Sequence, residues 1–336
     1  MKSIKATDTS AAAVNPPTGV ETIVGAELEA VEATLARLLD SNESQIAEIC
    51  HYLIDGSGKR LRPTFIMLVY RACGGTDDRV IDAVDAATAL ELIHSATLLH
   101  DDIIDAGTLR RGRPSAFARY GFAPSLVAGD YLFCRAFELC GRFEESLVLT
   151  AARACIQLTE GEAMEGRLRH NAGVGLDEYL TVITRKTASL FAAGGRVAAQ
   201  LAGASPEIAD AMARLGNAIG LSFQMIDDLL DILGPEQKIG KPVGSDLRAG
   251  IPSLPVVLAA QGSPELRALM SNGAAHDGAS FDRMLAILRA PEIIAHGRAL
   301  AAEQIARARE LITALAPSVY RDSLVALIDD QVGREA

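Results

Sequence analysis

The chain has 336 residues, enough to bury one large hydrophobic core or two modest ones. Hydrophobic residues make up 49% and charged residues 22%, a balance that excludes a disordered chain. Aromatic residues are only 4% and Trp is absent, which favours helices over β-sheet. The formal net charge of -11 argues against nucleic acid as a partner, so any phosphate-binding surface has to be a local basic cluster.

The start of the chain differs from the rest. Residues 1–24 are small, polar and contain Pro, and we expect a disordered tail ahead of one domain over 25–336. A helical period begins near Gly25 and puts these residues on one face: Leu28, Val31, Leu35, Leu38 and Leu39.

The remainder reads as a series of helices separated by Gly- and Pro-containing breaks. The predicted helices cover 44–55, 64–73, 79–105, 124–141, 145–171, 177–202, 206–233, 253–261, 280–289, 292–315 and 320–333. We find no hairpin signal, no alternating strand and no repeat. The pattern predicts a single all-α domain.

The sequence also bears on compartment. No apolar stretch reaches the roughly 20 residues that span a bilayer, and no apolar secretion-signal segment follows Met1. The five cysteines are odd in number and show no metal-like clustering. We therefore expect a cytoplasmic protein whose cysteines are reduced core thiols.

Two apolar helices carry the same acidic pattern, DDxxD. It begins at Asp101 and ends at Asp105 in the first, and runs from Asp227 to Asp231 in the second. Residues four apart share a helix face, and like charges there cost about 0.2–0.5 kcal/mol. A single pattern could be a solvated acidic patch. Two of them among Leu, Ile and Met indicate a magnesium site shared with substrate phosphates.

Two basic clusters could neutralise such phosphates. They are Lys59, Arg60 and Arg62 after a Gly-rich turn, and Arg110, Arg111 and Arg113 after the first aspartates. Arg side chains match phosphate oxygens and Lys adds a point charge. No P-loop is present, because the chain lacks GxxxxGK[ST].

Six segments occur in a defined order: GKRLRP, LIHSATLLHDDIID, LRRGRPS, RKTASLF, FQMIDDLLD and GKPVGSDLRAG. From about residue 25 to the C-terminus, the chain resembles the trans-polyprenyl diphosphate synthases, the farnesyl, geranylgeranyl and long-chain isoprenyl diphosphate synthases. The resemblance implies an antiparallel helical bundle of the isoprenoid synthase type around a deep central cavity, usually as a homodimer.

The resemblance also implies roles for particular residues. Asp101 and Asp105 would bind two Mg²⁺ ions, and Asp227 a third, with Asp231 supporting it through water. The allylic diphosphate would be contacted by Arg110, Lys186, Thr187, Gln224 and Lys241. The isopentenyl diphosphate would be bound by Lys59, Arg62, His94 and Arg111. Asp101, Asp105, Asp227 and Lys186 would be the catalytic set.

Plainer interpretations exist for several of these residues. His94 could be a satisfied core histidine, Gln224 an interhelical hydrogen-bonding residue, and Lys186 and Lys241 surface lysines. One position departs from the family pattern, because Ile251 stands where a second lysine is usual. We expect this to weaken one contact to the allylic diphosphate.

The implied reaction joins isopentenyl diphosphate to an allylic primer, farnesyl or geranylgeranyl diphosphate, through an allylic cation. Ala96 and Thr97 lie about 6–8 Å deeper than Asp101 along the helix, at 1.5 Å per residue. Because both are small, we expect a long all-trans product, about C35–C50 by analogy with the family. It would suit a quinone side chain and be delivered to a membrane.

Three alternatives remain open. The first is a shorter-chain farnesyl or geranylgeranyl synthase. The second is a class I terpene cyclase, which would not need Lys59 or Arg62. The third is a non-catalytic subunit of a prenyl synthase, which would be expected to lack intact aspartates. The sequence does not reveal whether an accessory subunit is needed.

Overall fold

The computed structural model describes residues 19, 23–54, 58, 60–234, 242–271 and 278–333. Most of the predicted tail 1–24 lies outside these residues, as do Lys59 and Lys241. Helices make up almost all of the described chain, which confirms the all-α class.

The N-terminal half contains α2 (Gly25–Leu39), α3 (Ser44–Ile54), α4 (Leu61–Ala72), α5 (Val80–Ile104), β1 (Leu109–Arg110), β2 (Arg113–Pro114), α6 (Ala116–Tyr120), α7 (Phe122–Cys140) and α8 (Glu145–Leu168). The C-terminal half contains α9 (Leu176–Ile183), the π-helical turn η1 (Thr184–Ala188), α10 (Ser189–Leu201), α11 (Pro206–Leu233), α13 (Ser245–Arg248), α14 (Leu254–Gly262), α15 (Pro264–Ser271), α16 (Gly278–Leu288), α17 (Pro291–Ile312) and α18 (Val319–Gly333).

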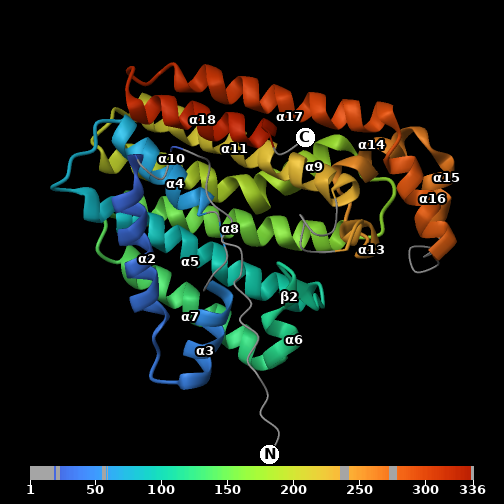
Figure 1. Ribbon diagram of the computed structural model, residues 1–336, viewed down its shortest axis with the longest axis horizontal. Coiled ribbons are helices and arrows are strands. Elements are labelled where there is room, and N and C mark those ends of the chain that lie inside the picture. Colours follow the sequence, from blue (N-terminus) through green and yellow to red (C-terminus); the bar gives the residue numbers. More distant parts are fainter. Residues whose placement is uncertain are drawn as a thin grey trace, which may run out of the picture.

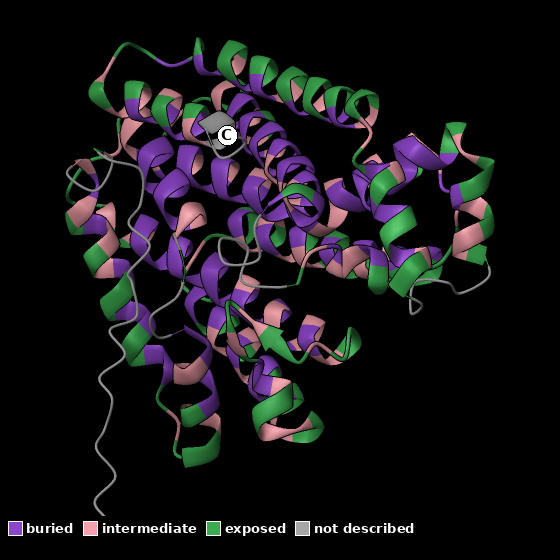
Figure 2. Ribbon diagram, turned by 45° about the vertical axis from the view of Figure 1, so that its right-hand side comes forward, coloured by how far each residue is buried: buried purple, intermediate pink, exposed green. Residues whose placement is uncertain are grey.

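The helices form a layered bundle. α17 and α18 run along one side over α11, α5 and α8 cross the middle, and α3, α6 and α7 lie on the opposite side (Figure 1). The most extensive helix contacts join α10 to α11, α5 to α7 and α11 to α17. The inner helices are largely buried, whereas exposed positions gather on the outer faces (Figure 2).

The two helices that carry the aspartates belong to this interior. α5 is apolar nearly all round and buried on most sides, as expected for a helix at the centre of a bundle. α11 starts with Ser205 as N-cap and Pro206 in its first turn, which fixes its beginning. The apolar sequence of α5 therefore explains its burial, and the residues Ser205 and Pro206 explain where α11 begins.

The structure corrects the prediction that the chain contains no hairpin. A hairpin, expected to be absent, pairs Arg110 with Arg113, and its turn uses positive φ at Arg111 (53°) and Gly112 (75°). Two-residue strands are too short to show alternation, so the periodicity could not reveal them. The short helices α6, α13 and α15 were also missed.

Two further features concern compartment and cysteines. Across the part of the chain that the structure describes, no helix is both long and apolar enough to cross a membrane. All five cysteines are free, and Cys50 and Cys140 are buried. Cys134 is exposed, so the prediction of a core thiol is wrong there.

Candidate active site

The first aspartate segment ends α5. Asp101 lies in its last turn and Asp105 caps it, with the Asp105 N–H donating to the Asp101 carbonyl at 2.8 Å. The two residues are thus one turn apart, as predicted. Burial raises the pKa of Asp101 to about 7, and nearby Lys186 opposes that shift. Within the described residues the Asp101 carboxylate makes no hydrogen bond, so a bound cation would stabilise its charged form.

The second aspartate of this segment, Asp102, holds the hairpin. Arg110 Nε lies 2.9 Å from both carboxylate oxygens of the buried Asp102, and Arg110 Nη2 is 2.8 Å from Oδ1. Arg110, expected at the allylic diphosphate, therefore lies beside Asp101 but pairs with Asp102. Its side chain is 28% exposed.

Lys186 lies in the π-helical turn η1, between two carboxylates of α8. Its Nζ is 2.6 Å from Glu162 Oε2 and 2.5 Å from Glu165 Oε1. Burial alone would lower the pKa of Lys186, but Glu165, Asp101 and Glu162 outweigh it and raise the pKa, so the ammonium stays charged. The sequence did not single out Glu162 and Glu165, because acidic residues on a helix usually form a solvated face.

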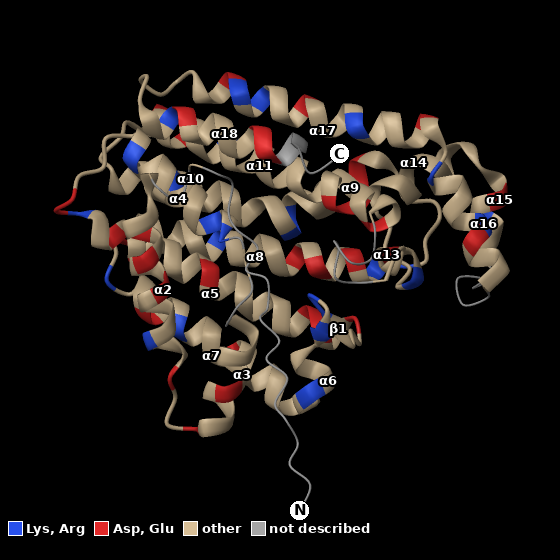
Figure 3. Ribbon diagram, in the orientation of Figure 1, with Lys and Arg blue, Asp and Glu red and all other residues tan. Residues whose placement is uncertain are grey.

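Gly161 makes this arrangement possible. A Cβ at position 161 would lie 2.6 Å from the Lys186 backbone nitrogen and 2.9 Å from Arg185 Cβ. Only a glycine lets α8 and η1 approach so closely. Acidic positions follow one another along α8, and charges of both signs gather near β1 (Figure 3).

The second aspartate segment connects to η1 through side-chain hydrogen bonds. Thr187 Oγ1 donates to Gln224 Oε1 at 2.9 Å, and Gln224 Nε2 donates to Asp228 Oδ1 at 2.8 Å. Asp228 also accepts hydrogen bonds from Tyr179 Oη and from the Leu254 N–H, each at 2.8 Å. Burial raises the pKa of Asp228 to about 7.

The other two aspartates of this segment differ in their surroundings. Asp231 is buried and accepts hydrogen bonds from Ser245 Oγ at 2.6 Å and from the Asp246 N–H at 3.3 Å. Asp227 lies within electrostatic range of Arg62. Asp228 and Asp231 thus anchor α14 and α13, while Asp227 interacts electrostatically with Arg62 of the basic cluster.

The two segments therefore belong to one site. Lys186 interacts electrostatically with Asp101, and its neighbour Thr187 is hydrogen-bonded to Gln224, three residues before Asp227. η1 packs against both α8 and α11. The π-helical turn η1 thus interacts with both acidic patterns, with the first through Lys186 and with the second through Thr187 and Gln224.

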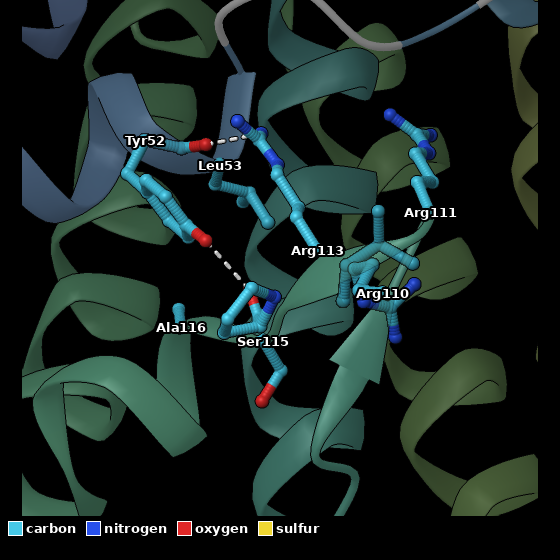
Figure 4. Close-up of a pocket in the computed structure, with 9 residues that line it drawn as sticks. Tyr52, Leu53, Arg110, Arg111, Arg113, Ser115 and Ala116 are labelled. Carbon is cyan, nitrogen blue, oxygen red and sulfur yellow. Dashed lines mark hydrogen bonds between the residues drawn. The ribbon is translucent and has the colours of Figure 1, made fainter. Parts of the chain in front are cut away.

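A basic region lies next to this site. One small pocket is lined by Arg60, Glu91, His94 and Arg111, and an adjoining one by Arg110, Arg111 and Arg113. In Figure 4, Arg113 reaches the Tyr52 carbonyl, and the Tyr52 hydroxyl donates to the Pro114 carbonyl at 2.7 Å. His94 and Arg111, predicted to bind isopentenyl diphosphate, thus line one pocket.

Burial and neighbouring charges determine the charge states of the side chains in this basic region. Burial and the surrounding arginines, Arg62 and Arg111 foremost, lower the pKa of His94 well below its usual value, so the imidazole is neutral. The Arg62 guanidinium carbon lies 4.7 Å from the Phe191 ring centroid, and its Nε is buried without a hydrogen-bond partner in the described chain. Such a cation suits an incoming anion. Arg60, predicted as part of the first basic cluster, is held by Glu32 and by Glu91, at 3.2 Å from the latter.

The donor chemistry fits a hard divalent cation. Among the described residues, no three His, Cys, Asp or Glu side chains are gathered as a ready metal cluster. Asp101, however, is a carboxylate that accepts no hydrogen bond from the described part of the chain, in an environment where burial disfavours its charge. Carboxylates that share a cation with substrate phosphates are the usual magnesium arrangement.

Comparison with known proteins supports the same conclusion. A sequence profile described as polyprenyl synthetase matches residues 43–289. The chain is 34% identical over 322 residues to a nonaprenyl diphosphate synthase of Mycobacterium tuberculosis, covering 94% of this chain and 95% of that protein. It is 37% identical over 234 residues to a geranylgeranyl diphosphate synthase of Methanosarcina mazei, covering 68% and 71% of the two chains.

Among solved structures, a polyprenyl synthase from Caulobacter crescentus CB15, complexed with calcium and isoprenyl diphosphate, superposes with a TM-score of 0.89 at 32% identity. The match covers 94% of this chain and 97% of that one. Fold and site together define an all-α enzyme of the isoprenoid synthase type. The chain belongs to the polyprenyl synthetase family and is a prenyltransferase, a trans-polyprenyl diphosphate synthase.

Proposed function

We propose that the protein condenses isopentenyl diphosphate onto farnesyl or geranylgeranyl diphosphate to give an all-trans long-chain polyprenyl diphosphate. The observation that carries the proposal is the link through η1, where Lys186 lies beside Asp101 and Thr187 is bonded to Gln224. Cationic and hydrogen-bonding groups thus lie between the two acidic segments, where an allylic diphosphate would be gripped.

Magnesium would be held by Asp101, Asp105 and Asp227, up to three ions with substrate present. When bound, it would supply positive charge that stabilises the departing diphosphate. In this proposal Asp231 positions α13 by its bonds to Ser245 and Asp246. The polar shell of the second segment would thereby keep Asp227 in place.

The isopentenyl diphosphate would bind at Arg62, His94 and Arg111, with Lys59, and with Arg60 held nearby. The neutral His94 can donate one hydrogen bond to a phosphate oxygen, while the arginines supply charge. Holding the isopentenyl double bond about 3–3.5 Å from the allylic carbon would turn a bimolecular reaction into an intramolecular one.

The allylic diphosphate would leave toward Lys186 and Arg110, whose charges are already in place before the bond breaks, and, as the resemblance implies, toward Lys241. The amide dipole of Gln224 would lie next to the allylic cation. The proton lost after carbon–carbon bond formation would pass to the diphosphate, so no dedicated base is required.

Product length would be set below the first aspartates. Ala96 is fully buried, and Thr97 donates its hydroxyl to the His94 carbonyl at 2.7 Å. Neither bears an aromatic ring that could block a growing chain, and Ile93 and Ala89 continue the same helix. A product of about C35–C50 follows by analogy with the family, and a quinone side chain is its proposed use.

We also propose a homodimer in the cytoplasm, with delivery of product to a membrane. Several large apolar side chains are exposed on two helices: Leu126, Val127 and Phe137 on α7, and Leu149 and Ile156 on α8. Exposed apolar side chains on an otherwise charged surface suit an interface with a second copy.

The decisive assay supplies radiolabelled isopentenyl diphosphate with farnesyl diphosphate and Mg²⁺, followed by sizing of the product. A parallel incubation contains the allylic diphosphate alone. We expect a long labelled product only when both substrates are present. Release of a hydrocarbon from the allylic substrate alone would instead identify a cyclase.

A further inference from the structure

Arg169 is a cation at the aspartate site that none of the roles above uses. It follows the last residue of α8, and its Nη2 forms an ion pair with Asp105 Oδ1. Its Nε is buried and has no hydrogen-bond partner among the described residues. The Arg169 side chain is 19% exposed and that of Asp105 is 30% exposed, so solvent still reaches the pair.

The backbone holds Arg169 in this place. The N–H of the next residue, His170, donates to the Gly250 carbonyl at 2.8 Å, and His170 has a positive φ of 59°. A Cβ at position 250 would lie 2.3 Å from the His170 ring, so the ring packs directly on this loop. Arg169 is thus fixed between Asp105 and the loop that begins at Gly250.

That loop contributes no charge of its own toward the site. Ile251 is apolar, and the guanidinium of Arg248 lies over the Phe281 ring, 3.4 Å from its centroid. Arg169 is therefore the cation that the described structure places between the loop and the first aspartates. A guanidinium with an unused buried N–H is suited to donate a hydrogen bond to a second oxygen besides that of Asp105.

We propose that Arg169 is a further binding residue for the diphosphate of the allylic substrate, an inference that rests on the proposed function. Diphosphate oxygens beside Asp105 would give Nε the acceptor that it lacks and would share the positive charge that now pairs with Asp105. The residue would act in binding rather than in bond breaking.

The test compares Arg169→Ala with Arg167→Ala, a matched control because Arg167 is exposed on the same helix. We expect Arg169→Ala to raise KM for farnesyl diphosphate by about tenfold to a hundredfold, the effect of one charged hydrogen-bonding group. KM for isopentenyl diphosphate should stay near that of the control. Adding Ile251→Lys to Arg169→Ala should recover part of the loss.

Calorimetric titration of inorganic diphosphate in the presence of Mg²⁺ provides a readout independent of turnover, and Arg169→Ala should bind it more weakly than Arg167→Ala. Equal affinities and equal KM values in the two variants would overturn the proposal. Tighter diphosphate binding by Arg169→Ala would also overturn it, because Arg169 would then compete with ligand for Asp105. If the wild type binds diphosphate through Arg169 but performs no condensation, the proposed function fails while this inference stands.

Discussion

Replacing Gly161 by Ala tests whether the close approach of α8 and η1 is what positions Lys186. The added Cβ would lie 2.6 Å from the Lys186 nitrogen and 3.0 Å from its Cα, whereas carbon contacts are comfortable at about 3.5–4.0 Å. η1 must therefore move by about 1 Å, and a displacement of that size can cost about a hundredfold in rate.

Stability should change less than rate, because a hundredfold loss in rate corresponds to about 2.7 kcal/mol. Overpacking costs about 1–3 kcal/mol, and the higher helix propensity of Ala returns up to about 1 kcal/mol of that. The assay is kcat/KM for condensation, measured beside urea unfolding of the same preparation. Gly166→Ala is the matched control. Gly166 lies on the same helix as Gly161, and a Cβ at position 166 would meet no atom within 4 Å. Equal kcat/KM values for the two variants would refute the reasoning.

Four further changes have defined outcomes. Tyr179→Phe removes one donor to the buried Asp228 and should lower the free energy of unfolding by about 1–3 kcal/mol in urea titrations; an unchanged midpoint would contradict this. Ala96→Phe should shorten the product seen by chromatography, and an unaltered distribution would refute an open channel floor. Chelation of Mg²⁺ by EDTA should abolish turnover and excess Mg²⁺ should restore it; turnover that persists in EDTA would count against a metal requirement. Phe137→Asp should shift the sedimentation coefficient from dimer to monomer, and an unchanged value would remove α7 from the interface.

The long helices were predictable because burial imposes a period that the sequence displays. The helix predicted over 79–105 is observed at 80–104, and that over 206–233 is observed with the same bounds. The predicted helix 177–202 is continuous but contains a π-helical turn at Thr184–Ala188. The hydrophobic period of the sequence does not reveal this turn, because its residues are of the same types as those in an α-helix.

The site was predictable only in part. The aspartates and Lys186 carry distinctive motifs, but the partners of Lys186 do not. Glu162 and Glu165 become significant only because Gly161 lets α8 approach η1, a tertiary contact with no local signal. The hairpin likewise depends on Arg111 adopting a positive φ, which non-glycine residues rarely do.

The central claim, that both aspartate segments serve one reaction centre, is tested most directly by a double-mutant cycle on kcat. Asp101→Asn and Asp227→Asn should each reduce kcat by about 10²–10³-fold, the usual cost of losing one transition-state stabilising group. If the two carboxylates act on the same diphosphate, the double variant should lose little more than either single variant. Losses that simply multiply would mean that the two segments act independently and would contradict the account.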